Sequence, residues 1–264
     1  MKIQPQGTKP PLFLIHPGGA NLLAYKDLIS CMDTERPLYG LDAKGFEEGQ
    51  TPQETVEEMA VQYLEAIRGV QPEGPYLLMG WCFGGLVAFE MAQLLRSQGQ
   101  KTAFLGLIDT YIRSGQVPQD DVNLLIGLSF ELFGVEFPIE KLRQMEGNER
   151  IIYIFEQVKE ANRLPPNFGL DRMKRLLEVN KSHDQASVKY FSQAYPGAVT
   201  LIRAREDAPA TLNNPTLGWE MQADKVNLHW VGGDHLSMFH HPHVQELAKK
   251  LEFCIEQAEI LRTF

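Results

Sequence analysis

A glycine-rich turn between two apolar segments constrains the fold of this chain more than any other feature. The turn spans residues 80–85, with the sequence GWCFGG; it follows the short apolar run 75–79 and precedes apolar residues at helical spacing over 86–95. Another apolar run, 103–108, comes shortly afterwards. A strand, a helix and a further strand in this order are typical of a parallel sheet with helices on its faces.

The segments before this turn continue the alternation. Short apolar runs at 11–15 and 37–41 are typical of buried strands. Between the second run and the turn, the sequence has the pattern of a helix start. Thr51 is suited to the N-cap, Pro52 to the first helical position and Glu54 to the third. Apolar residues at helical spacing follow them. We therefore expect a helix that begins at Pro52.

A block without strand signals interrupts the alternation from about residue 112 to 195. Helical patterns occupy three segments within it: 123–133, 149–162 and 171–191. Two strand patterns and a closing amphipathic helix then follow in the segments 199–203, 226–231 and 243–260. We predict an α/β fold with a mostly parallel, doubly wound sheet built from residues 1–111 and 196–264, and a helical lid inserted at 112–195.

Cys82 occupies the nucleophile position of the pattern G-x-S-x-G, with Gly80 and Gly84 on either side. Small neighbours allow a side chain on a strained strand-to-helix turn to stand clear of the sheet. The start of the next helix adds positive potential, and the N–H of Phe83 can donate to an oxyanion. Glycine turns of this kind also serve packing alone, but the position between a strand and a helix favours a catalytic cysteine.

His235 is the candidate general base for this thiol. It lies in segment 232–238, GGDHLSM, directly after the last predicted strand, where a loop can carry it back over the turn. A lone surface histidine would need no functional explanation. His235, however, comes last in the order nucleophile, acid, histidine, as in the hydrolase fold.

Two aspartates are candidates for the acid that orients His235. Asp109 ends the apolar run 104–108, which would not otherwise deliver a charge. Asp207 follows the later strand near the charged residues Arg203, Arg205 and Glu206, where a solvated salt-bridge loop explains it well. Both belong at the carboxyl edge of the sheet, where such sites lie. The pattern favours Asp109 and leaves Asp207 as the alternative.

Two further segments contain glycine or histidine in suggestive patterns. Residues 16–20, HPGGA, follow the first clear strand, and their glycines would let backbone N–H groups approach a ligand as the second half of an oxyanion hole. His240, His241 and His243 cluster near the C-terminus, but no carboxylate or cysteine accompanies them at ligand spacing. We interpret them as a solvated helix entrance and expect no metal site.

Charge and cysteine content argue against several classes of function. The chain has 25 Lys and Arg against 34 Asp and Glu, a formal net charge of −9, which repels nucleic acid and anionic membranes alike. Its three scattered cysteines form no CxxC pair and predict neither a disulfide framework nor a zinc site. With no signal-peptide or transmembrane pattern, we expect a soluble protein of the reducing cytoplasm.

These residues together resemble the thioesterase domains that end nonribosomal peptide synthetases and polyketide synthases, within the α/β-hydrolase fold. The resemblance runs nearly the full length and rests on the lead-in 3–13, the turn 16–19, the elbow 80–85, the strand end at 108–109 and the loop 233–235. The chain departs from the usual pattern at Cys82, where most members have serine.

Membership of this family implies a reaction and a partner. An acyl or peptidyl chain would pass from the phosphopantetheine thiol of an upstream carrier protein onto Cys82, and then leave by hydrolysis or by macrocyclisation through a nucleophile in the chain itself. His235 would act as base, Asp109 as its orienting partner, and the N–H groups of Phe83 and Gly18 as oxyanion donors. No cofactor of the domain's own is implied. The lead-in resembles the linker that follows a carrier domain.

Three alternatives remain open at this stage. A stand-alone editing thioesterase more often has its acid after the later strand, which would give the role to Asp207. A stand-alone hydrolase of the dienelactone type also uses a cysteine elbow. A non-catalytic receptor of the hydrolase fold would be expected to lack part of the triad, whereas this chain has a candidate for every role.

Overall fold

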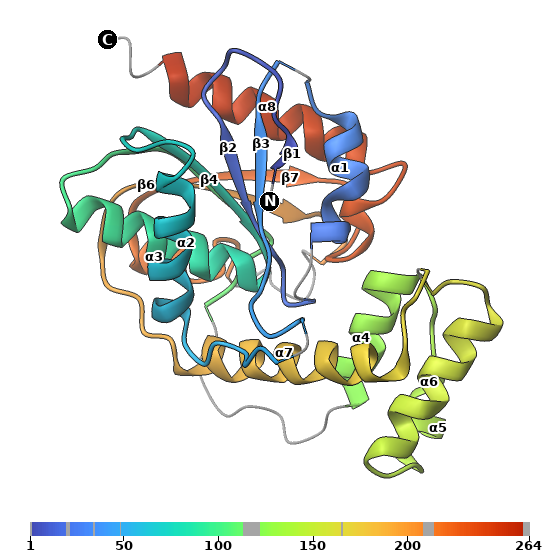
Figure 1. The fold of residues 1–264 in the computed structure, drawn as a ribbon. Coiled ribbons are helices and arrows are strands. Elements are labelled where there is room, and N and C mark those ends of the chain that lie inside the picture. Colours follow the sequence, from blue (N-terminus) through green and yellow to red (C-terminus); the bar gives the residue numbers. More distant parts are fainter. Residues whose placement is uncertain are drawn as a thin grey trace.

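Within the residues that the structure describes, seven strands form one mostly parallel sheet (Figure 1). This computed structural model describes residues 2–19, 22–33, 35–47, 49–112, 122–164, 166–207 and 214–260. The strand order across the sheet is β1-β3-β2-β4-β5-β6-β7. The strands are β1 (Lys2–Gln4), β2 (Leu12–Ile15), β3 (Leu38–Leu41), β4 (Tyr76–Trp81), β5 (Thr102–Ile108), β6 (Tyr195–Ala204) and β7 (Ala223–Val231). The edge strand β1 is antiparallel to β3, and the other described pairs are parallel.

Helices cover both faces of the sheet, which confirms the doubly wound prediction. The α-helices are α1 (Lys26–Cys31), α2 (Val56–Arg68), α3 (Phe83–Ser97), α4 (Val122–Phe133), α5 (Ile139–Arg143), α6 (Asn148–Glu160), α7 (Leu170–Lys189) and α8 (Val244–Ile260). Helices α2 and α3 share an apolar core with one face of the sheet, and α1 and α8 share a second core with the other. In the described part of the chain, no helix is long and apolar enough to cross a membrane.

Helix α2 begins at Val56 rather than at Pro52, so the predicted start is wrong. Thr55 is the N-cap, and its side chain accepts a hydrogen bond from the N–H of Glu58. Val56 is fully buried and starts the apolar stripe of the helix, whereas Thr51 and Pro52 lie in irregular chain before it. The helix begins after Thr55 and not after Thr51, because Thr55 directly precedes the buried Val56 and packing of the apolar face supplies most of a helix's stability.

The helices α4 to α7 follow one another between β5 and β6 and confirm the three predicted helical segments. They bury a core of their own, to which Ile154, Val158 and Leu176 belong. Figure 1 shows α4, α5 and α6 beside the main body, with α7 passing along the lower side of it. Ala186 and Tyr190, at the end of α7, belong instead to the sheet core. Helix α7 therefore connects the two cores. Residues 113–121 of the predicted insertion lie outside the described residues.

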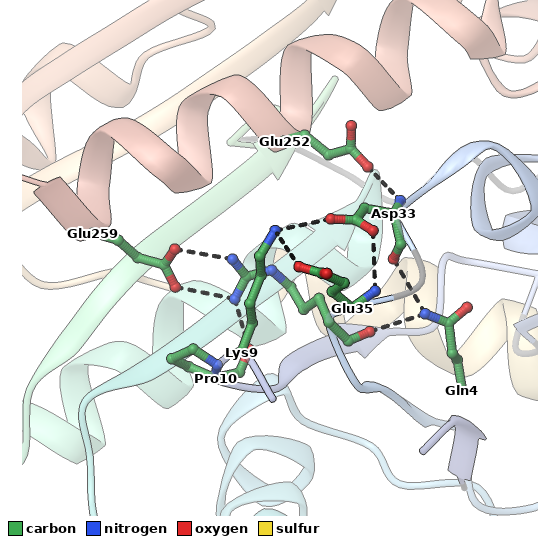
Figure 2. A network of polar contacts seen from close by, with 8 residues as sticks. Gln4, Lys9, Pro10, Asp33, Glu35, Glu252 and Glu259 are labelled. Carbon is green, nitrogen blue, oxygen red and sulfur yellow. Dashed lines mark hydrogen bonds and ion pairs between the residues drawn. The ribbon is translucent and has the colours of Figure 1, made fainter. Parts of the chain in front are cut away.

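A network of polar contacts joins the N-terminal segment to α8 (Figure 2). The guanidinium of Arg36 makes two hydrogen bonds of 3.0 Å to Glu259 on α8, and it also donates to the carbonyl of Pro10. Beside it, Lys9 forms an ion pair with Asp33 at 2.8 Å. The Arg36 side chain is only 6% exposed, so its pairing satisfies a buried charge. These contacts join the segment before β2 and the segment before β3 to the closing helix.

Candidate active site

The ends of five neighbouring strands bring the sequence-predicted residues to one edge of the sheet. Parallel strands present their carboxyl ends at the same edge, where open α/β sheets place their ligand sites. The residues that follow the strands directly are His16 after β2, Cys82 after β4, Asp109 after β5, Arg205 after β6 and Gly232 after β7. The structure thus gathers residues from widely separated parts of the chain into one candidate site.

Cys82 stands on a strained turn between β4 and α3. Its backbone has φ 52° and ψ −119°, a conformation that side-chain-bearing residues rarely adopt. A Cβ on Gly80 would lie 2.1 Å from the backbone of Gly84, and one on Gly84 would lie 2.4 Å from the carbonyl oxygen of His16. Only glycine fits at either position. This close approach explains the spacing of the motif and holds the half-buried thiol at the N-terminus of α3.

His235 lies between Cys82 and Asp109. Its Nδ1 is 2.5 Å from Oδ2 of Asp109, and its side chain lies within electrostatic range of the thiol of Cys82. Asp109 is buried and, like Cys82, has a positive φ, of 42°. The three predicted residues therefore form one continuous line of contacts, in the geometry of a thiol, a base and an orienting acid.

The surroundings of His235 favour the protonated imidazole. Burial of the ring opposes the charge, but the neighbouring Cys82 and Asp109 outweigh it and hold the pKa of His235 well above its usual range. The imidazole is consequently well suited to take the proton of the thiol.

Asp207, the alternative acid, contacts the same histidine through a different atom. Its Oδ2 accepts the backbone N–H of His235 at 2.7 Å. Burial and the nearby Asp109 raise the pKa of Asp207, although the hydrogen bond from His235 opposes this. Asp234 supports the loop further, since its Oδ1 accepts the N–H groups of Leu236 and Ser237. Asp207 and Asp234 thus hold the backbone of the loop, and Asp109 holds the ring.

A buried arginine lies behind the candidate acid. The Nε atom of Arg203 is 3.8 Å from Oδ1 of Asp109, and its guanidinium stacks over the ring of Trp230 at 4.7 Å. Another nitrogen of the group donates to the carbonyl of Pro215. Sequence reasoning treated Arg203 only as a charged neighbour of Asp207, because its inward direction on β6 depends on the pairing of that strand.

The two candidate oxyanion donors lie close together at the start of α3. As the first residue of the helix, Phe83 has an N–H that the helix itself does not use. A Cβ built on Gly18 would be 4.0 Å from the Cβ of Phe83, so the two turns are adjacent. His16 is buried beside Phe83. Its Nδ1 is 2.8 Å from the carbonyl oxygen of Pro17, and its Nε2 is 2.7 Å from the hydroxyl of Tyr63. Ala20 of the predicted turn lies outside the described residues.

Two residues of α7 that sequence reasoning missed also contact this turn. Asn180 Nδ2 donates to the carbonyl oxygen of Gly18 at 2.6 Å, and His183 Nδ1 lies 3.2 Å from the same oxygen. Both side chains are buried. The sequence offers no signal for them beyond two polar residues three positions apart on an amphipathic helix.

The histidine cluster near the C-terminus forms no metal centre in the part of the chain that the structure describes. Among the described residues, no three His, Cys, Asp or Glu side chains converge in a way that could hold a metal ion. His240 instead lies 3.3 Å from the carboxylate of Asp27, beside α1.

The sheet order, the helices on both faces and the elbow define a protein of the α/β-hydrolase class. A thioesterase domain model matches residues 10–254, and the chain belongs to this family. It is 27% identical over 97% of its length to the nonribosomal peptide synthetase acyN of Ascocoryne sarcoides and 40% identical over 47% of its length to a dimodular nonribosomal peptide synthase of Bacillus subtilis. It spans only 29% and 5% of these two proteins.

Solved structures give the same assignment. The four-domain nonribosomal peptide synthetase AB3403 matches 96% of this chain with a TM-score of 0.85 and 26% identity, and the match covers 20% of that protein. A second match is the NocB thioesterase domain, solved in covalent complex with a fluorophosphonate nocardicin G analogue. The match covers 97% of this chain and 98% of the NocB chain, with a TM-score of 0.72. At 22% identity, this likeness concerns the fold. The chain is therefore a hydrolase of the thioesterase type found in nonribosomal peptide synthetases. Such domains need no cofactor of their own, and their substrate is carried on the phosphopantetheine arm of a carrier domain.

Proposed function

We propose that this domain releases an acyl or peptidyl chain from the phosphopantetheine thioester of an upstream carrier domain through a covalent acyl-Cys82 intermediate. The observation that carries the proposal is the line of contacts from the Cys82 thiol to His235 and from His235 to Asp109. In a thioesterase fold, this line supplies a nucleophile, its base and an orienting acid at the expected edge of the sheet.

The first half of the reaction exchanges one thioester for another. His235 takes the proton of Cys82, and the sulfur attacks the carbonyl carbon of the bound chain. The N–H groups of Phe83 and Gly18 stabilise the negative oxygen of the tetrahedral intermediate. The bond between the carbonyl carbon and the phosphopantetheine sulfur then breaks, and the departing thiolate takes the proton back from His235.

The second half transfers the chain from Cys82 to its acceptor. His235 removes a proton from water or from an amine or hydroxyl of the chain itself, and the acceptor displaces the Cys82 thiolate, which takes this proton from His235 to restore the thiol. Exchange between two thioesters is nearly isoenergetic, so the enzyme-bound chain keeps the activation that an oxoester on serine would lose. We therefore propose that Cys82 favours capture by an internal nucleophile, with the helical insertion as a lid that excludes water.

The proposed partner is the carrier domain of a nonribosomal peptide synthetase. The relatives are synthetases of which this chain matches one part. The contacts of Asp207 with the backbone of His235, and of Asp109 with its ring, support this terminal type over a stand-alone editing enzyme. A free thiol as nucleophile also fits the reducing cytoplasm expected from the sequence.

The test is covalent trapping on the intact protein. The wild-type chain and Cys82→Ala would be incubated with acyl and peptidyl thioesters of N-acetylcysteamine, and protein mass would be recorded over time. We expect a mass increase that maps to Cys82, is absent from Cys82→Ala, and decays to a hydrolysed or cyclised product. A folded wild-type protein that acquires no adduct and turns over none of these thioesters would refute the proposal and favour the binding-only alternative.

A further inference from the structure

The carbonyl groups on both sides of the Gly18 N–H are held by buried side chains. The Gly18 N–H belongs to the same peptide plane as the carbonyl of Pro17, which lies 2.8 Å from His16 Nδ1. Because the two groups point in opposite directions in a trans peptide, anchoring the Pro17 oxygen sets the direction of the Gly18 N–H. The following carbonyl, that of Gly18, is held by Asn180 and His183 of α7.

His16 and His183 both donate to this turn through Nδ1, as their protonation state shows. Burial lowers the pKa of His16 to about 4, and burial together with His16 lowers the pKa of His183 well below its usual range. Both rings are therefore neutral near pH 7. A carbonyl oxygen only accepts, so Nδ1 of each ring carries the proton and donates to the turn. The Nε2 of His16 then accepts from Tyr63.

His183 also contacts the other candidate donor residue. Its ring stacks on Phe83 with centroids 4.5 Å apart and an interplanar angle of 10°, and on His16 at 4.9 Å and 23°. His183 is 2% exposed, and its ring lies beside both halves of the candidate oxyanion hole. One residue of the helical insertion thus touches the Gly18 turn by a hydrogen bond and the Phe83 turn by stacking.

Helix α7 is placed to transmit the position of the insertion to this turn. Its first half contributes Met173, Leu176 and Leu177 to the core of the insertion, and its end contributes Ala186 to the sheet core. Asn180 and His183 lie between these two sets on the same helix, three residues apart and on one face. A displacement of the insertion relative to the sheet would therefore move the donors that hold the Gly18 carbonyl.

We propose that Asn180 and His183 are positioning residues that hold the carbonyl of Gly18, and with it the peptide plane that follows the Gly18 N–H. In this way they would stabilise the turn that presents this N–H to the oxyanion, and couple the oxyanion hole to the helical insertion. The inference rests on the proposed acyl-Cys82 chemistry and adds to it residues from outside the triad. Backbone donors accelerate acyl transfer only when they are aimed at the oxyanion in advance, so loss of these contacts should slow the chemical step more than substrate binding.

The experiment compares two reactions of the same thiol. Acylation of Cys82 by an N-acetylcysteamine thioester passes through an oxyanion, whereas alkylation by iodoacetamide does not. The variants are Asn180→Asp, which keeps the size but puts a carboxylate against the Gly18 oxygen, and His183→Phe, which keeps the stacked ring without the donor. His183→Asn, which restores a donor near Nδ1, tests rescue. Ser182→Ala is the matched control, because Ser182 is on the same helix and donates instead to the carbonyl of Gln53.

We expect Asn180→Asp and His183→Phe to lower kcat for the thioester by roughly tenfold to a hundredfold. KM and the alkylation rate of Cys82 should stay near the wild-type values, His183→Asn should recover part of the loss, and Ser182→Ala should change little. Acylation at the wild-type rate in both variants, a parallel fall in alkylation, or an equal loss in Ser182→Ala would each overturn the inference. No adduct on the wild-type protein would instead refute the proposed function, and this inference with it.

Discussion

The Nδ1 atom of His235 lies 2.5 Å from Oδ2 of Asp109, a buried carboxylate at the end of β5. A second aspartate, Asp207, accepts the backbone N–H of the same histidine. The two acids that the sequence offers for one role thus have two different contacts, one with the ring and one with the main chain. Only the contact with the ring can set its tautomer and stabilise its positive charge.

Exchanging each of these acids for its amide should separate the two roles. We expect Asp109→Asn to lower the rate of Cys82 acylation by roughly a thousandfold, because the amide no longer stabilises the imidazolium. Asp207→Asn keeps an oxygen that can accept the His235 N–H, so the loss should stay below about tenfold. Acylation rates with a thioester substrate measure both. The opposite order would assign the acid to Asp207 and favour an editing enzyme.

Replacing the nucleophile should change the fate of the bound chain. Cys82→Ser would form an oxoester, which is less activated toward amines than the thioester. We expect a lower ratio of cyclised to hydrolysed product, measured by chromatography with a peptidyl thioester that carries an internal nucleophile. An unchanged ratio would remove the proposed advantage of cysteine, even if the overall rate falls.

The glycines of the elbow should tolerate no side chain. Gly84→Ala places a Cβ against the carbonyl oxygen of His16, and we expect a loss of several kcal/mol in the free energy of unfolding, about 2 to 4. Gly127→Ala is the control, since a Cβ at Gly127 in α4 meets nothing within 4 Å. Removal of a helical glycine should stabilise the protein by up to about 1 kcal/mol. Urea unfolding of both variants tests the contrast, and an equal effect would contradict it.

The buried His16 should make the protein sensitive to acid. Its pKa is about 4 in the folded chain, against roughly 6.5 in the unfolded chain, so between these values the unfolded state binds one proton more. Stability is therefore lost as the pH falls through this range, by about 1.4 kcal/mol per pH unit for one such histidine. Above pH 6.5 this contribution is constant.

The matching experiment is urea unfolding at several pH values between 4.5 and 6.5, in steps of about half a unit. We expect His16→Gln to reduce the slope of stability against pH by roughly one proton, whatever its stability at pH 7. His241→Gln, which alters an exposed histidine, should keep the wild-type slope. Identical slopes for wild type and His16→Gln would show that His16 does not resist protonation.

Much of the fold and of the triad could be predicted because each signal is local. The apolar run before Cys82, the glycines beside it and the helical spacing after it lie within about twenty residues of one another. Asp109 follows the end of β5 directly, and His235 lies in the loop that follows β7. Parallel strands bring such ends to one edge whatever the length of chain between them. The start of α2 was misplaced because two capping patterns occur a few residues apart, and burial of Val56 decided between them.

The sequence by itself determined the strand–turn–helix unit, the parallel sheet, and Cys82 and His235 as candidate nucleophile and base, because short-range spacing and the order of elements encode them. The tertiary structure alone decided which aspartate meets the ring of His235, and that Asn180 and His183 reach Gly18 from a helix more than 150 residues away. The physical reason is that such contacts depend on how α7 and the loops after β6 and β7 pack against the sheet. No local pattern of residues carries that information.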